Sequence, residues 1–114
     1  MADERRFNKR RKFGYYMRVV DSNTHELVGY LSDISNRGFK LDSAQPLPVG
    51  EHYNLRLDLP NEVADKNFLV FMAKSKWCST DKADPFTQNV GFEIINITPQ
   101  DAAIYNRIIE RYAS

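Results

Sequence analysis

Apolar and polar residues alternate along much of the chain, in short runs that are separated by turn-forming residues. The run "HYNLRLDL" at His52–Leu59 alternates at every position, which is typical of a strand with one buried face. Clusters of Gly, Pro, Asn, Asp and Ser separate this run from others rich in β-branched and aromatic residues. The pattern predicts strands over residues 12–20, 26–34, 39–43, 52–59, 68–78 and 89–97.

The hydrophobic period changes from two residues to that of a helix after the last of these strands. Thr98 is suited to cap a helix, Pro99 to its first position, and Asp101 to its first turn, where a negative charge is favourable. We therefore predict one helix, at about 98–112. One apolar stripe along it contains Ile104, Tyr105, Ile108, Ile109 and Tyr112.

Six strands without helices between them, followed by one helix, favour a small barrel over a sandwich. The predicted fold class is all-β, a six-stranded antiparallel β-barrel that a C-terminal α-helix closes. With 114 residues, of which 42% are hydrophobic and 27% charged, the composition is typical of one soluble globular domain.

Positive charge is concentrated at the start of the chain. Residues 1–12 contain six basic and two acidic residues, a net charge of +4, which leaves −3 for the remainder because the whole chain carries +1. Such an asymmetry indicates an anionic partner. We divide the chain into a flexible basic N-terminal arm, residues 1–12, and a barrel with its helix, residues 13–114.

Several classes of function are not expected. Cys78 is the only cysteine, so no intrachain disulfide can form, and the absence of a long apolar segment predicts a cytoplasmic protein without membrane insertion. His25 and His52 have no metal-ligand spacing, and no glycine-rich phosphate loop or acid–base pair is evident. We therefore predict no catalytic residues, metal or cofactor, and a protein that is not an enzyme.

Two motifs remain that carry chemistry. The first is R-x-x-x-R at Arg6 and Arg10, and the second is D-x-S-x-x-G at Asp33, Ser35 and Gly38, between the second and third predicted strands. Each has an ordinary explanation by itself, because a basic segment can be a solvated tail and Asp, Ser, Asn and Gly are common turn residues.

Together and in this order, the two motifs resemble those of the PilZ domain family, over about Glu4 to Tyr112. The stretch "VGFEIINITPQD" also resembles the family's last strand and helix start. The resemblance implies a bacterial receptor for the second messenger cyclic di-GMP, in which both motifs form the ligand site. The implied ligand-binding residues are Arg5, Arg6, Arg10, Asp33, Ser35 and Gly38.

The chemistry of these residue types fits such a ligand, which has two phosphodiesters and two guanines. A guanidinium group donates a fork of hydrogen bonds to phosphate and stacks on a purine, as expected of Arg6 and Arg10. The Asp33 carboxylate can accept the N–H groups of a guanine edge, and the Ser35 hydroxyl can bond guanine or phosphate. Gly38 lets the backbone turn sharply or the ligand approach closely.

Three details of the resemblance concern stoichiometry and the rim of the site. Arg5, directly before R-x-x-x-R, implies that the ligand binds as an intercalated dimer. Arg37 stands where the family frequently has a small residue, and we interpret it as a solvated turn residue that could add a phosphate contact. Trp77 could stack on a guanine, although packing in the core or at the rim is the favoured interpretation.

We expect a single-domain adaptor that orders its arm on binding cyclic di-GMP and then signals to an effector protein in motility, adhesion or exopolysaccharide control. The alternatives are a small β-barrel nucleic-acid-binding protein with a basic arm, and a PilZ interaction module that binds no ligand. The net acidic body argues against nucleic acid, and the intact motifs argue against a ligand-free module.

Overall fold

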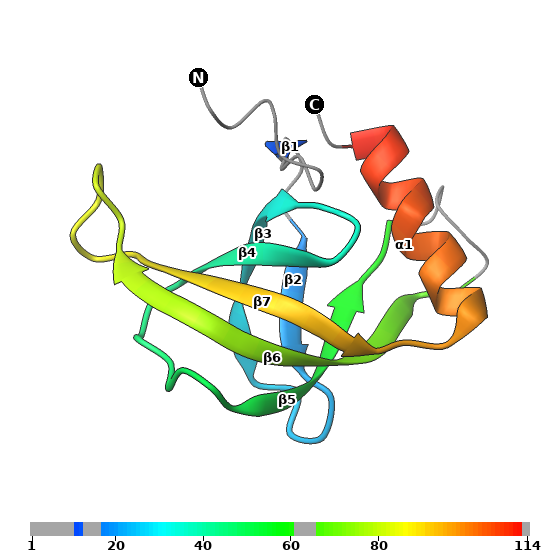
Figure 1. Cartoon of the computed structure of the whole chain (residues 1–114), viewed down its shortest axis with the longest axis horizontal. Coiled ribbons are helices and arrows are strands. Elements are labelled where there is room, and N and C mark those ends of the chain that lie inside the picture. Colours follow the sequence, from blue (N-terminus) through cyan, green and yellow to red (C-terminus); the bar gives the residue numbers. More distant parts are fainter. Residues whose placement is uncertain (1–10, 13–16, 61–65, 113–114) are drawn as a thin grey trace.

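The fold is a closed antiparallel barrel with one helix at its end (Figure 1). The structure, a computed structural model, describes residues 11–12, 17–60 and 66–112. Of the predicted flexible arm, residues 1–12, the first ten lie outside the described residues, and Arg11–Lys12 form a short strand. The elements are β1 Arg11–Lys12, β2 Arg18–Asp21, β3 Leu27–Ile34, β4 Gly38–Ser43, β5 His52–Asp58, β6 Phe68–Thr80, β7 Gln88–Asn96 and α1 Pro99–Tyr112.

The sheet closes because β3 pairs with β2 and also with β4, in the order β3-β2-β5-β6-β7-β4. The predicted six-stranded antiparallel barrel with a C-terminal helix is confirmed. The short β1 pairs with the end of β3, on the edge that β2 also uses, because β4 occupies the other edge. The first predicted strand, 12–20, is therefore two strands in the structure, β1 and β2, with residues 13–16 outside the description.

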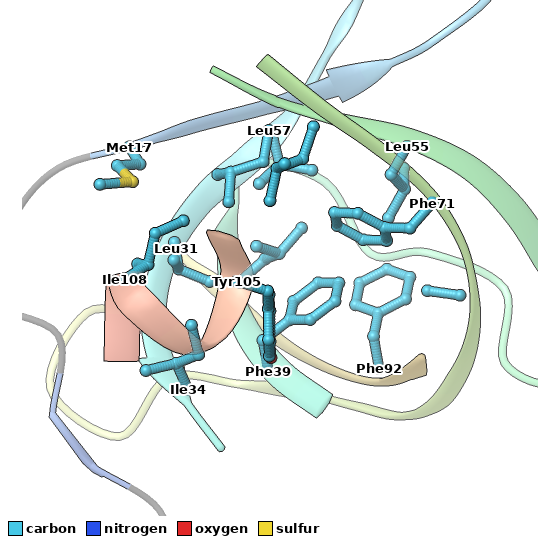
Figure 2. Close-up of a cluster of buried hydrophobic side chains, with 14 of the residues drawn as sticks. Met17, Leu31, Ile34, Phe39, Leu55, Leu57, Phe71, Phe92, Tyr105 and Ile108 are labelled. Atoms are coloured by element: carbon cyan, nitrogen blue, oxygen red, sulfur yellow. The ribbon is translucent and has the colours of Figure 1, made fainter. Parts of the chain in front are cut away.

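Side chains from all sides of the barrel meet in one core (Figure 2). Phe39 of β4 lies at its centre, stacked on Phe92 with ring centroids 5.2 Å apart, and it meets Phe71 edge-on at 5.5 Å. The alternation predicted from the sequence places the leucines of β5 inside, where Leu55 and Leu57 are fully buried. Burial of these apolar side chains is the main contribution to stability.

Helix α1 covers one end of the barrel with the predicted apolar stripe. Ile104, Tyr105, Ile108 and Ile109 are all buried against the core. The helix begins after Thr98, whose hydroxyl accepts a hydrogen bond from the Asp101 backbone N–H at 3.2 Å, as predicted for an N-cap.

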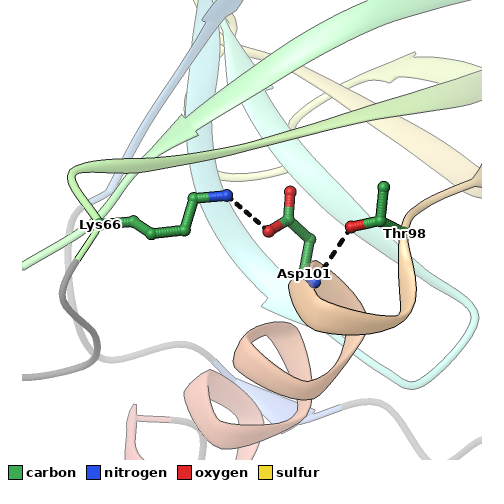
Figure 3. A network of polar contacts seen from close by, with 3 residues as sticks. All are labelled: Lys66, Thr98 and Asp101. Atoms are coloured by element: carbon green, nitrogen blue, oxygen red, sulfur yellow. Dashed lines mark hydrogen bonds and ion pairs between the residues drawn. The ribbon is translucent and has the colours of Figure 1, made fainter.

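The start of α1 is also joined to the segment that precedes β6 (Figure 3). The Lys66 ammonium group lies 2.7 Å from the buried Asp101 carboxylate. The negative charge of Asp101 in the first turn also favours the helix dipole. Helix α1 is thus held on the barrel by the polar contact in its first turn as well as by its apolar face.

Candidate functional site

The D-x-S-x-x-G motif forms the tight connection between β3 and β4. The Ser35 backbone N–H donates to the Gly38 carbonyl at 2.8 Å, and the Ser35 hydroxyl donates to the same oxygen at 3.3 Å. Both residues are buried, Ser35 with 6% of its surface exposed. The serine therefore closes the turn by bonding to its own backbone.

Helix α1 holds this turn from inside the molecule. The buried Tyr105 hydroxyl lies 2.7 Å from the Ser35 carbonyl oxygen and 2.9 Å from that of Gly38, so its proton is shared between the two. On the other side of the turn, the Ile94 N–H donates to the Arg37 carbonyl at 2.8 Å. The turn is consequently bonded to the helix and to β7. The sequence placed Tyr105 in the apolar stripe but carried no signal for this contact.

Gly38 is required by the packing of two strands. A Cβ atom at this position would collide with the Phe92 carbonyl oxygen of the neighbouring β7. Its φ is not positive, since Gly50 is the positive-φ glycine of the described residues. The close approach of β4 and β7, rather than a sharp turn in the backbone, explains why a glycine stands here.

Asp33 belongs to a row of residues that crosses the outer face of the sheet. The registers place Lys12 opposite Asp33, Asp33 opposite Lys40, Lys40 opposite Gly91 and Gly91 opposite Trp77. Their neighbours Ile34, Phe39 and Val90 are buried in the core, so Asp33, Lys40, Gly91 and Trp77 face outward. We call Lys12, Asp33, Lys40, Gly91 and Trp77 the outer row.

Trp77 is placed on the outer face by a bulge in β6. The register between β6 and β7 shifts between Ser75 and Trp77, which leaves Trp77 opposite Gly91. The indole lies directly on Gly91, where a Cβ atom would collide with the ring, and 40% of the residue remains exposed. The exposed ring therefore covers β7 at Gly91, the residue that lies opposite Lys40 in the register.

Basic and acidic groups face each other around the outer row. The pKa of Asp81, in the loop after β6, is lowered mainly by the backbone N–H of Ala83, then by the Asn89 side chain, with a smaller effect of the Lys40 charge. The Asn89 amide also donates to the Asp42 carboxylate at 3.0 Å. The row thus offers a cation, a carboxylate and an aromatic face on one surface.

The other predicted site residues are distributed as follows. Arg37 is exposed at the tip of the turn, as a solvated turn residue should be. Arg5, Arg6 and Arg10 lie outside the described residues. The next residue, Arg11, is opposite Ile34, so the chain enters the fold beside the D-x-S-x-x-G turn.

Within the described ranges, no group of three or more His, Cys, Asp or Glu side chains is placed to hold a metal ion. The α-helix found in this part of the chain is neither long nor apolar enough to cross a lipid bilayer.

Comparison with solved structures shows the same fold. The PilZ domain of YcgR from Escherichia coli, solved with c-di-GMP, is 19% identical and matches with a TM-score of 0.71, covering 95% of this chain and 91% of that one. The Bacillus subtilis inhibitor of motility MotI/DgrA is 21% identical, with a TM-score of 0.72, covering 94% of this chain and 50% of that one. A second YcgR structure from E. coli, in complex with c-di-GMP, is 18% identical, with a TM-score of 0.67, 93% of this chain and 45% of that one being covered.

No curated protein matches the chain. The family model of the PilZ domain, in contrast, matches residues 4–112, which includes both motifs and every element of the described fold. The chain therefore belongs to the PilZ domain family.

Proposed function

We propose that this chain is a receptor for cyclic di-GMP that acts through contact with another protein and not through catalysis. The observation that carries the proposal is the outer row. It aligns Asp33 with Lys12, two residues after the R-x-x-x-R motif, and with Trp77 on the same face. The YcgR structures with c-di-GMP have the same fold, which supports this ligand.

Each motif has a distinct role in this proposal. Arg6 and Arg10 bind the phosphodiesters and stack on the guanines, and Asp33 accepts the N–H groups of a guanine edge. Ser35 and Gly38 complete the site by fixing the turn, since both lie within its hydrogen bonds. Trp77 adds an aromatic face at the rim, and Arg37 a cation near the turn tip.

Ligand stoichiometry and signalling complete the proposal. With Arg5 beside the motif, two ligand molecules bind as an intercalated dimer. Their four phosphodiester charges fix the basic N-terminal arm across the outer row. The surface that forms in this way is read by an effector protein that controls motility, adhesion or exopolysaccharide output, in the cytoplasm. The similarity to an inhibitor of motility supports the first of these processes.

Isothermal titration calorimetry with cyclic di-GMP tests the proposal. Arg6→Ala, Arg10→Ala and Asp33→Ala should each lose about 1.5–3 kcal/mol of binding free energy, the size of a hydrogen bond to a charged group. Arg5→Ala should lower the stoichiometry from two ligands to one. Arg56→Ala is the matched control, because Arg56 lies on β5, away from the outer row, in an ion pair with Asp58.

Two outcomes would contradict the proposal. The first is an unchanged affinity of Arg10→Ala or Asp33→Ala. The second is a wild-type protein that ignores the nucleotide at millimolar concentration. Titration with a single-stranded oligonucleotide separates the nucleic-acid alternative, because many phosphate contacts on a polymer give a steep dependence on salt and a dinucleotide gives a shallow one.

A further inference from the structure

A pocket opens between β3 and β4, at the end of this strand pair that is remote from the D-x-S-x-x-G turn. Its volume is about 400 Å³, and it is lined by the start of β3, the end of β4 and the segment that follows β4. From Asp33 to Val28 the strand advances by about 17 Å at 3.3 Å per residue, so the end of the pocket at Val28 lies apart from the Asp33 end of the outer row. Nothing derived above assigns it a role.

The pocket lies where the pairing of β3 with β4 ends. Their pairing runs from Tyr30 opposite Asp42 to Ile34 opposite Phe39. Among the described residues, Leu27 and Gly29 pair only with β2, and Ser43 pairs only with β7. Because alternate residues of a strand bond to opposite sides, Val28, which lies between Leu27 and Gly29, is the part of β3 that faces the pocket without a strand partner in the described residues. An open strand edge beside apolar pockets is the structure that accepts an added peptide strand.

The side chains of the pocket are suited to an apolar residue of such a strand. Val28, Leu47 and Tyr53 lie in its lining and pack against the core from that side. Leu27 stands at the rim with 49% of its surface exposed. A large aliphatic residue exposed beside an apolar hollow is a feature of surfaces that bind a partner.

The charges in the lining of the pocket favour a bound segment with positively charged side chains. Three carboxylates lie in its lining, those of Asp21, Glu26 and Asp42, and no lysine or arginine lines it within the described residues. Asp21 accepts the backbone N–H groups of Asn23 and Thr24, and these bonds lower its pKa, so it stays charged at neutral pH. Glu26 is exposed at the pocket, so its carboxylate can meet a cation of a partner.

We propose that this pocket, which we call the seam pocket, binds an extended segment of a partner protein in which apolar residues alternate with lysine or arginine. The segment lies along β3 at Val28, places an apolar side chain on Val28 and Leu47, and directs its cations to Glu26 and Asp42. The inference holds whether or not the outer row binds cyclic di-GMP, so a failed nucleotide titration does not decide it.

The test uses the full chain and the probe peptide acetyl-Lys-Val-Arg-Val-Lys-Leu-amide. Two-dimensional NMR should show shifts of the backbone amides of Leu27–Gly29 and Ser43–Gln45, and fluorescence anisotropy of a labelled peptide gives its affinity. Glu26→Lys should weaken binding about threefold to tenfold, the range of one or two exposed ion pairs. Leu27→Thr, which keeps a strand-forming residue, should weaken it by a similar factor.

Two controls make the test specific. Glu110→Lys introduces the same charge change on an exposed position of α1, outside the pocket, and should change the affinity less than twofold. A peptide with glutamate in place of each lysine and arginine should not bind. Equal loss in Glu26→Lys and Glu110→Lys, binding of the acidic peptide, or amide shifts confined to other strands would overturn the proposal.

A synthetic peptide of residues 4–12 tests whether the seam pocket instead binds the basic N-terminal arm of this chain. The partner proposal predicts that this peptide binds at least about tenfold more weakly than the alternating probe, because its cations do not alternate with apolar residues. If the peptide of residues 4–12 binds more tightly than the alternating probe and shifts the same amides, the assignment to a partner protein is overturned.

Discussion

Two connections between neighbouring strands, the turn at 35–37 and the loop at 81–87, are stabilised differently. Besides the bonds between Ser35 and Gly38, the first is bonded to other elements of the fold, through the Tyr105 hydroxyl of α1 and Ile94 of β7. The second bonds inward: Asp81 accepts from the N–H groups of Ala83 and Asp84 at 2.9 and 3.0 Å, and Asp84 accepts from the Thr87 hydroxyl at 2.8 Å.

The difference shows in what each connection exposes. Ser35 and Gly38, which flank the first, are buried, whereas Phe86 in the second is 85% exposed at the end of the β6–β7 hairpin (Figure 1). Substitutions in the first connection should therefore change the stability of the core and the affinity of the ligand site. Substitutions in the second should affect only the loop itself.

The largest effect should come from Gly38→Ala. The added methyl group meets the Phe92 carbonyl oxygen, which belongs to a paired strand and cannot move without breaking the ladder. We expect a loss of about 1–3 kcal/mol in the free energy of unfolding, the cost of overpacking a tight site. Urea unfolding measures it. Phe86→Ala is the comparison in the loop at 81–87. An equal loss of unfolding free energy in this variant would contradict the expected difference between the two connections.

An intermediate effect is expected for Tyr105→Phe. Removal of the hydroxyl leaves the ring in the core but takes away the proton shared by the Ser35 and Gly38 carbonyls, at a cost of about 1–2 kcal/mol in the free energy of unfolding. The affinity for cyclic di-GMP should fall as well, because the turn loses its support from the helix.

Tyr53→Phe is the matched control for this substitution. It removes a hydroxyl bonded to the Pro48 carbonyl at 3.3 Å in an exposed position. Its unfolding free energy should change by less than about half of the Tyr105→Phe value. Equal losses of unfolding free energy in the two variants would mean that the bond between the helix and the turn stabilises the protein no more than an exposed hydrogen bond does.

The smallest effect concerns the acid response of the second loop. The bonds from Ala83 and Asn89 lower the pKa of Asp81 below its ordinary value of 3.8. The stabilisation is therefore complete above the unfolded pKa and is lost as the pH falls through the lower folded pKa. A ¹³C NMR titration of the Asp81 carboxyl carbon should give a midpoint below 3.8. A midpoint at or above that value would contradict the bonding described.

The strands and the helix could be predicted because each is determined by local patterning. The alternation of His52–Asp58 places Leu55 and Leu57 inside, and the apolar stripe and the Thr98 cap define α1 within one residue. The division of the first strand could not be predicted. Between Arg11 and Arg18 the chain advances seven positions while β3 opposite advances four, and such a mismatch is set by pairing rather than by periodicity.

The site was predictable in its residue types but not in its geometry. Asp33, Ser35 and Gly38 were identified from their motif, yet the contact that holds the turn comes from Tyr105, which is 70 positions from Ser35. The place of Trp77 depends on the bulge in β6, which no local pattern in the sequence marks. The roles of Arg5, Arg6 and Arg10 stay predictions, because these residues lie outside the described part of the chain.

The ion pair between Lys66 and Asp101 has a consequence for biosynthesis. It joins positions 35 residues apart, and α1 is translated after all the strands that it covers. A helix of 14 residues is marginal in isolation, so it gains its stability by docking. During synthesis the end of the barrel that α1 covers cannot be closed until the helix has been made and has docked, and apolar surface that is exposed at such a stage is prone to aggregation.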